Sequence, residues 1–268
     1  MTATPKRFLA LDTFRGMTIC FMIIVNTPGN GATTFSPLQH AHWNGFTPTD
    51  LVFPSFLFAV GNAMSFVMPK WANLQQSSVL WKILRRTFVI FLLGFLMYWF
   101  PFVKMGQGNH VVGFPLNETR VFGVLQRIAL CYGIAALLFY YLKPRTVLVI
   151  GIALLFIYWA LLYWLGDFNN PLSLEGNAVL RIDRWLIGDK HLYHGEGVAF
   201  DPEGLLSTLP AIANVIGGYM AGKYIQRKGS DYEGLSVLLL SGLVLVFLGY
   251  CWDLSFPVNK KLWTSSFV

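Results

Sequence analysis

Two histidines separated by one residue, His40 and His42, lie in a short polar stretch between two apolar segments. Trp43 and Asn44 follow, and Asp50 stands at the start of the next apolar run. The imidazole side chain, with an unperturbed pKa of about 6.5, is suited to proton transfer near neutral pH. The stretch is therefore a candidate catalytic site at a membrane boundary. The alternative is an ordinary interfacial loop, since His, Trp and Asn are common at membrane surfaces.

The composition indicates that a membrane surrounds these residues. Of 268 residues, 55% are hydrophobic and 12% are charged, whereas soluble domains have about 25% charged residues. The mean hydropathy is +0.54. We therefore expect a lipid bilayer as partner, and we interpret the net charge of +7 as loop charge that sets topology, not as a nucleic-acid site. The three cysteines lie in apolar segments, and this odd number argues against a disulfide framework.

Apolar segments long enough to cross a bilayer recur along the whole chain. A spanning helix needs about 20 mostly apolar residues, so the first extends from about Phe8 to Asn26, and no signal-peptide cleavage site follows it. An apolar run that begins near Leu262 predicts an eighth span, cut off at Val268. The sequence therefore predicts an all-α polytopic membrane bundle with about seven complete spans, a single domain over 1–268 that is incomplete at its C-terminus. The six other complete spans are Leu51–Met68, Thr87–Val103, Val121–Leu142, Thr146–Leu165, Leu205–Ala221 and Leu235–Trp252.

The lysines and arginines give the predicted orientation. With the N-terminus in the cytoplasm, the inner connecting segments carry more of these cations than the outer ones, although the outer segments are longer. Because cytoplasmic loops are enriched in Lys and Arg, we expect a multi-pass protein of the plasma (inner) membrane with a cytoplasmic N-terminus. The stretch 36–54 then lies on the outer side, and Lys82, Arg85 and Arg86 lie on the inner side.

The longest polar segment, residues 166–204, is predicted to be an outer loop, and loops of this length are usually functional or disordered. Its last residues predict a helix start, with Asp201 as N-cap and Pro202 in the first turn. His191 and His194 suggest a metal site. Two histidines without a carboxylate or cysteine at ligand spacing are weak evidence for one, so we expect no metal.

Charged and amide side chains within the predicted spans are costly in lipid and are therefore candidates for function. Asn26 ends the first helix on the outer side, and Arg127 lies in the outer third of the fourth span. The topology therefore predicts that Asn26 and Arg127 meet His40 and Asp50 in one outer-half pocket. The alternative interpretation makes Asp50 and Arg127 a structural ion pair and Asn26 a helix cap.

Two further groups of charges have two interpretations each. Asp12 and Arg15, three residues apart, lie on one helix face and can pair. This pair serves structure, or Arg15 faces an anionic cofactor. Lys82, Arg85 and Arg86 determine topology and contact lipid headgroups, or they bind the phosphates of a nucleotide-bearing cofactor, which guanidinium groups bind well.

The stretch HAHWNGFTPTDLVFP, residues 40–54, resembles the signature of the transmembrane acyltransferases related to heparan-alpha-glucosaminide N-acetyltransferase. The resemblance covers essentially the whole chain, because four further segments match the family in the same order. Since the family typically continues for several more spans, the resemblance also favours an incomplete chain. The four segments are LDTFRGMTICFMIIVN (Leu11–Asn26), GVLQRI (Gly123–Ile128), FDPEGLLSTLPAIANVIGGYMAG (Phe200–Gly222) and PVNKKLWTSSFV (Pro257–Val268).

The resemblance implies an enzyme that moves an acetyl group from cytosolic acetyl-CoA to an amino sugar on the far side of the membrane. It implies that His40 is the catalytic histidine, as base or as acetyl carrier, and that Asn26 is an important site residue. Asp50 is then placed to orient His40, while His42 is a second imidazole that could share the role. A homodimer stays open as a partner. The expected cofactor-binding residues are Lys82, Arg85, Arg86, Arg15 and Arg127.

Two functions from other classes remain open on the sequence. A transporter would line a substrate path with polar residues near the bilayer midplane, but it predicts broken helices and repeated halves, which the sequence does not display. A structural or assembly membrane protein would use the outer loop as a docking surface. Acetyl-CoA binding by the purified protein separates the enzyme from both.

Overall fold

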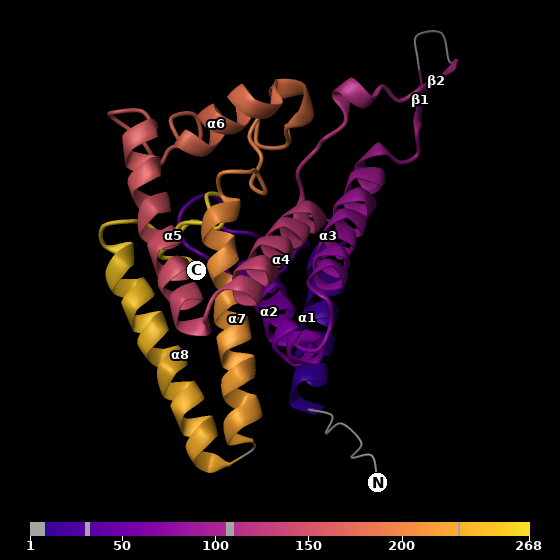
Figure 1. The fold of residues 1–268 in the computed structure, drawn as a ribbon. Coiled ribbons are helices and arrows are strands. Elements are labelled where there is room, and N and C mark those ends of the chain that lie inside the picture. The colour runs from indigo at the N-terminus through magenta and orange to yellow at the C-terminus, as the bar shows by residue number, and fades with distance from the viewer. Residues whose placement is uncertain (1–8, 30–32, 106–109, 230) are drawn as a thin grey trace.

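A computed structural model describes residues 9–29, 33–105, 110–229 and 231–268 of the chain. The described residues form a helical bundle with one short antiparallel hairpin (Figure 1). Residues 6–8, which the sequence assigned to the inner cations and the first helix, lie outside this described part. The helices are α1 (Leu9–Asn26), α2 (Val52–Val67), α3 (Gln76–Trp99), α4 (Val124–Tyr141), α5 (Pro144–Leu165), α6 (Ala178–Ile187), α7 (Thr208–Lys228) and α8 (Tyr232–Asp253), and the strands are β1 (Val103–Met105) and β2 (Val111–Gly113).

Seven long helices fall on the seven predicted spans, but only five described helices are long and apolar enough to cross a membrane. The two that fall short are α3, which carries Lys82, Arg85 and Arg86 in its first half, and α7, which ends on Arg227 and Lys228. The all-helical membrane class is thus confirmed, while the count of seven complete spans is not. The five are α1, the 48–71 segment that contains α2, α4, α5 and α8.

The predicted eighth span near Leu262 is wrong. Residues 257–268 form turns that lie buried in the bundle, with Leu262 and Trp263 almost fully inaccessible. Local hydrogen bonds compete with a helix here: the Asn259 side chain accepts the Leu262 N–H at 2.8 Å, and the Thr264 hydroxyl accepts the Asn259 N–H at 2.9 Å. The apolar run therefore fills the core between helices instead of starting a new one.

The centre of the bundle is the close packing of α2 against α7. A Cβ atom at Gly61 would overlap the carbonyl oxygen of Val215, and one at Gly218 would overlap that of Phe58. Glycine at these positions lets the two backbones touch, as small residues do between membrane helices. Helix α4 packs beside this pair, and Leu57, Tyr132 and Val215 are among the buried side chains of the shared core. Helices α1 and α8 are mostly exposed, as expected for lipid-facing helices.

The long loop 166–204 contains helix α6. Asn177 caps α6 by accepting the Leu180 N–H at 2.8 Å, and the apolar face of α6 packs with Phe200 and Tyr158 in a second core. The predicted N-cap role of Asp201 is wrong, because α7 begins only at Thr208. Asp201 instead accepts the N–H of Glu203 at 3.0 Å in a tight turn before the helix.

The predicted inner and outer segments lie at opposite ends of the bundle. In Figure 1 the N-terminal end of α1, the C-terminal end of α7 and the N-terminal end of α8 lie at one end, whereas α6 and the strands β1 and β2 lie at the other. The bundle therefore has two distinct ends. Which of them faces the cytoplasm remains a prediction from the lysine and arginine distribution.

Candidate active site

His40 and Asp50 form the central pair of the candidate site. The His40 Nδ1 atom lies 2.6 Å from Asp50 Oδ1. The Asp50 side chain is 1% exposed and that of His40 is 47% exposed, so one partner is fixed and the other is accessible. The second carboxylate oxygen, Oδ2, accepts the N–H of Thr47 at 2.9 Å, the Thr47 hydroxyl at 3.1 Å and the N–H of Ala41 at 3.1 Å.

The local sequence explains why this pair forms. Residues 48–51 are a short 3-10 helix that leads into α2, with Pro48 in its first turn and Thr47 as its N-cap. Asp50 is the third residue of this helix and bonds back to Thr47, a reciprocal arrangement of the capping-box type. The same carboxylate reaches across to Ala41 and His40, so it closes the whole loop 40–50.

The pair is arranged for proton transfer. An ionised Asp50 accepts the Nδ1–H of His40, and that tautomer leaves the Nε2 lone pair as the basic atom of the ring. The carboxylate also stabilises the imidazolium that forms when Nε2 takes a proton. The site therefore offers a partly exposed, oriented base beside a buried acid.

The structure does not bring Asn26 or Arg127 to this pair through direct hydrogen bonds. Asn26 is exposed at the end of α1, where its Nδ2 donates to the Met22 carbonyl at 2.8 Å. Arg127 is fully buried, and its Nη2 donates to the carbonyls of Pro202 at 2.8 Å and Gly204 at 3.2 Å. The predicted alternative of an Asp50–Arg127 ion pair is therefore wrong, because the segment before α7 engages the guanidinium.

Arg127 has a further neighbour that the sequence did not suggest. Its guanidinium carbon lies 4.9 Å from the ring centroid of Trp263, a cation–π contact, and its Nη2 also donates to the Ser207 hydroxyl. Arg127 thereby links α4, the start of α7 and the buried 257–268 segment.

Arg120 forms a second charged cluster on the side of the bundle that carries α6. Its guanidinium binds Asp201 through two hydrogen bonds, at 2.8 and 2.6 Å, and Glu203 through one at 2.7 Å. It also lies between the rings of Tyr98 and Tyr193, at 4.9 and 4.8 Å. Burial by itself lowers the pKa of Arg120, but the hydrogen bonds to Asp201 and the negative charges of Asp201 and Glu203 together raise that pKa.

His191, in the long outer segment, is held by contacts with the backbone before α4. The Nδ1 of His191 lies 2.8 Å from the Thr119 carbonyl oxygen, and the His191 carbonyl accepts the Val121 N–H at 3.1 Å. Within the described ranges, no group of three His, Cys, Asp or Glu side chains is placed to hold a metal ion.

The contacts that hold Asn44 and Gly45, in the loop that carries His40, were also not predicted from the sequence. The Gly45 N–H donates to the Val258 carbonyl at 2.7 Å, and the Asn259 Nδ2 donates to the Asn44 Oδ1 at 3.3 Å. The sequence feature that could have indicated these contacts is the segment PVNKKLW, which matches the family but was assigned to the start of a new span.

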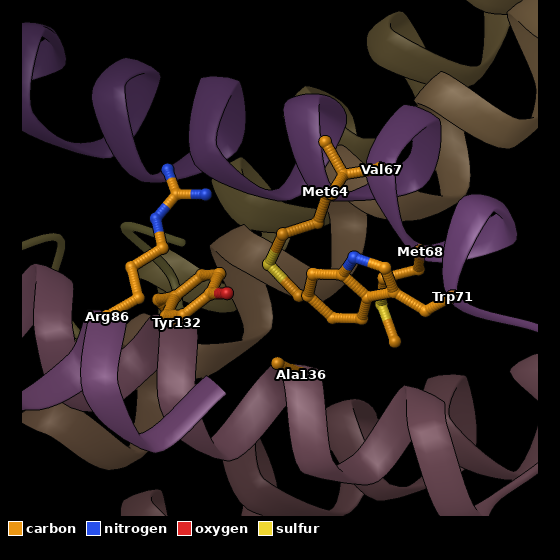
Figure 2. A pocket seen from close by; sticks show the side chains of 7 residues that line it. All are labelled: Met64, Val67, Met68, Trp71, Arg86, Tyr132 and Ala136. Carbon is orange, nitrogen blue, oxygen red and sulfur yellow. The ribbon is translucent and has the colours of Figure 1, made fainter. Parts of the chain in front are cut away.

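The basic residues expected to hold a cofactor lie toward the opposite end of the bundle. Lys82, Arg85 and Arg86 are exposed on α3, and the Arg86 guanidinium lies 4.8 Å from the ring centroid of Tyr132. Arg15 is exposed on α1. Figure 2 shows that Arg86 and Tyr132 face Met64 of α2, and Met68 and Trp71 of the 3-10 helix that follows it, across a small pocket. The pocket holds about 10 Å³, room for about one water molecule. The pocket is lined by Met64, Val67, Met68, Trp71, Arg86, Tyr132 and Ala136.

Helix α2 connects the two locations. Asp50 precedes its first turn and Met64 lies near its last. At a rise of 1.5 Å per residue the two are about 20 Å apart along the helix. A ligand that touches both must therefore span about 20 Å.

The chain was compared with known proteins. The sequence model of the family "Heparan-alpha-glucosaminide N-acetyltransferase, catalytic" matches residues 7–177. The chain is 31% identical over 324 residues to heparan-alpha-glucosaminide N-acetyltransferase of Homo sapiens, covering 100% of this chain and 47% of the human protein. It is 29% identical over 331 residues to the same-named protein of Mus musculus, covering 99% of the chain and 47% of the mouse protein. The chain thus spans about half the length of the curated relatives it matches.

Proposed function

Because the chain belongs to the heparan-alpha-glucosaminide N-acetyltransferase family, we propose that it is a membrane-embedded acyltransferase that moves an acetyl group from acetyl-CoA to an amino sugar. The observation that carries the proposal is the His40–Asp50 pair, an accessible imidazole held by a buried carboxylate. Both residues lie in the segment matched by the family model. The acceptor is expected on the outer side and the donor on the cytoplasmic side of a bacterial-type inner membrane.

In the proposed reaction His40 acts on the acceptor amine. The neutral amine attacks the thioester carbonyl, a C–N bond forms and the C–S bond of acetyl-CoA breaks. Nε2 of His40 takes the proton that the nitrogen sheds, and the imidazolium returns it to the departing CoA thiolate. Such proton transfer contributes about 10²–10⁴-fold to a rate. The alternative, in which Nε2 carries the acetyl group in a covalent intermediate, uses the same orientation by Asp50.

Asn26 is proposed as a donor to the oxygen of the tetrahedral intermediate. Its amide is exposed at the end of α1 and bonds the carbonyl of Met22 in its own helix. An exposed amide of this kind exchanges its partner for a substrate oxygen at little cost, because its present bond is solvated.

The donor is proposed to bind at the other end of the bundle. The guanidinium groups of Arg85 and Arg86, together with Lys82, suit the phosphates of CoA. The pantetheine arm is long and slender, which fits the distance of about 20 Å along α2 between the pocket at Met64 and the His40 loop. Arg15 on α1 remains a further candidate for the phosphates.

Arg127 is assigned a different role in this proposal. Its Nη2 donates to neutral acceptors, the carbonyls of Pro202 and Gly204 and the hydroxyl of Ser207. We propose that it supports the segment that leads into α7 and does not bind the cofactor.

The proposal is tested by measuring release of the free CoA thiol from acetyl-CoA by the purified protein in detergent, against a panel of amino sugars. We expect thiol release that depends on an amino sugar and yields an N-acetylated product, and none with the corresponding neutral sugars. Acetyl-CoA binding without amino-sugar-dependent release would refute the acceptor class, and failure to bind acetyl-CoA would refute the donor.

A further inference from the structure

The loop that carries His40 is attached to a segment more than 200 residues away in the sequence. Gly45 and Asn259 form an isolated parallel bridge, in which the Gly45 N–H donates to the Val258 carbonyl at 2.7 Å. Gly45 has a φ of +89°, a conformation that favours glycine. Beside this bridge, the Asn259 Nδ2 donates to the Asn44 Oδ1 at 3.3 Å.

Asn259 is the fixed partner in this attachment. Asn259 is 1% exposed, and each of its polar atoms has a hydrogen-bond partner. The side-chain Oδ1 accepts the Leu262 N–H at 2.8 Å, and its backbone N–H and carbonyl both bond to Thr264, at 2.9 and 3.0 Å. A side chain held at this many points directs its Nδ2 in one direction.

The segment around Asn259 is itself anchored to three helices. The Trp263 indole N–H donates to Asn214 of α7 at 3.0 Å, and its ring packs edge-on against Phe53 of α2 at 5.0 Å. The Tyr158 hydroxyl of α5 donates to the Leu262 carbonyl. The segment therefore transmits the position of the helical core to the Asn259 side chain.

Loop 40–50 is thus held from two sides. The Asp50 carboxylate fixes its base through Ala41, Thr47 and His40. Its tip is held by the Gly45–Val258 backbone bond and by the bond from the Asn259 side chain to Asn44. Because a shift of about 1 Å in a catalytic group costs about 10²-fold in rate, a loop fixed only at its base would present His40 less well.

We propose that Asn259, acting through Asn44, is a positioning residue that sets the orientation of the His40 imidazole over the reacting atoms. The inference rests on the proposed function, since it assigns a role in the acetyl transfer that His40 performs. Asn259 touches neither substrate nor cofactor in this role. Trp43 keeps the loop folded when the Asn44–Asn259 bond is lost, because its indole N–H donates to the Leu172 carbonyl at 2.9 Å.

The experiment uses substitutions at the exposed end of the bond. Asn44→Ala removes the acceptor and leaves the buried Asn259 network intact, whereas Asn44→Asp keeps an acceptor oxygen and is the matched control. We expect Asn44→Ala and Asn259→Ala to lower kcat about 10-fold, with KM for both substrates and the unfolding temperature of Asn44→Ala unchanged. Asn44→Asp should retain most of the wild-type kcat.

A double-substitution cycle tests whether the bond acts through the imidazole. Adding Asn44→Ala to an Asp50→Asn background should cost much less than it does in the wild type, because the orientation of His40 is already lost. If Asn44→Ala lowers kcat by the same factor in the Asp50→Asn background as in the wild type, the inference is overturned. An unchanged kcat in Asn44→Ala, or an effect on KM alone, would overturn it too. If Asn259→Ala does not fold, the Asn44 pair decides alone.

Different results would refute the proposed acetyl transfer and the positioning role of Asn259. An inactive wild-type protein, or an active His40→Ala variant, would refute the proposed function and the inference with it. Normal dependence on His40 together with full activity of Asn44→Ala would refute the positioning role alone.

Discussion

Replacing Asp50 by asparagine should invert the tautomer of His40. Oδ2 of Asp50 accepts the N–H groups of Thr47 and Ala41, whereas Oδ1 contacts His40 Nδ1. An asparagine NH₂ at the Oδ2 position would leave buried donors facing a donor, at about 1–3 kcal/mol for each unmade bond. The asparagine carbonyl should therefore occupy that position and turn its NH₂ toward His40.

The consequence for the imidazole follows from hydrogen-bond chemistry. Nδ1 facing an NH₂ group must accept, so the ring proton moves to Nε2 and the basic atom points into the loop. We expect Asp50→Asn to lower kcat about 10³-fold, or about 4 kcal/mol of transition-state stabilisation. The fold should change little, because the donors of Thr47 and Ala41 keep an acceptor.

The assay measures kcat, KM and unfolding temperature for Asp50→Asn in parallel with Thr47→Val. The latter removes the hydroxyl, which contacts Asp50 Oδ2 at 3.1 Å and the Gln39 carbonyl at 2.7 Å, but leaves the backbone N–H in place. We expect Thr47→Val to cost less than about 10-fold. If Asp50→Asn keeps kcat within about threefold of the wild type while His40→Ala is inactive, Asp50 does not orient His40.

Three other predictions address the cofactor, the outer segment and the topology. Replacing both Arg85 and Arg86 by alanine should weaken CoA binding about 10-fold or more with a smaller effect on the chemical step, measured by equilibrium binding and kcat; unchanged affinity would leave the cluster a topological role only. Burial raises the pKa of the Asp183 carboxyl to about 7, so between about pH 4 and 7 the unfolded chain releases this proton and the folded chain retains it. Wild-type stability should then fall with rising pH by up to about 1.4 kcal/mol per pH unit from this group. Asp183→Asn, compared by thermal unfolding at pH 5 and 8, should reduce that fall, and an equal fall in both proteins would contradict the burial argument. A cysteine introduced by Gln76→Cys should resist membrane-impermeant reagents applied outside intact cells, and labelling there would reverse the topology.

The helices were predictable because each long one contains a sustained apolar run. The number of helices that cross the membrane was harder to predict. The span in α3 was predicted to start at Thr87, yet the helix begins at Gln76 and includes three cations. A helix continues through charged residues when its apolar face is packed, so composition alone misplaces its start. Helix α6 within the segment 166–204 was not predicted, because it is stabilised by contacts with Phe200 and Tyr158, which lie outside the helix.

Residues near one another in the sequence were easier to place than residues far apart. His40 and Asp50 flank one short loop, and the structure pairs them directly. The partner of Arg127 could not be inferred from its depth in the span, because its carbonyl acceptors come from residues 202–204. The apolar run from Leu262 was mistaken for the start of a span because hydrophobicity does not distinguish a buried turn from a helix start. What distinguishes them here is Asn259, whose side chain closes the turn.

The comparison of His40→Ala with His42→Ala tests the central claim most directly. Both imidazoles are exposed in the same loop, so the two substitutions differ mainly in whether the pair with Asp50 is lost. With acetyl-CoA binding and acetyl transfer measured on each variant, His40→Ala should bind acetyl-CoA but lose at least about 10²-fold in turnover. His42→Ala should remain within a few-fold of the wild type. A dispensable His40 beside an essential His42 would contradict the mechanism and the assignment on which it stands.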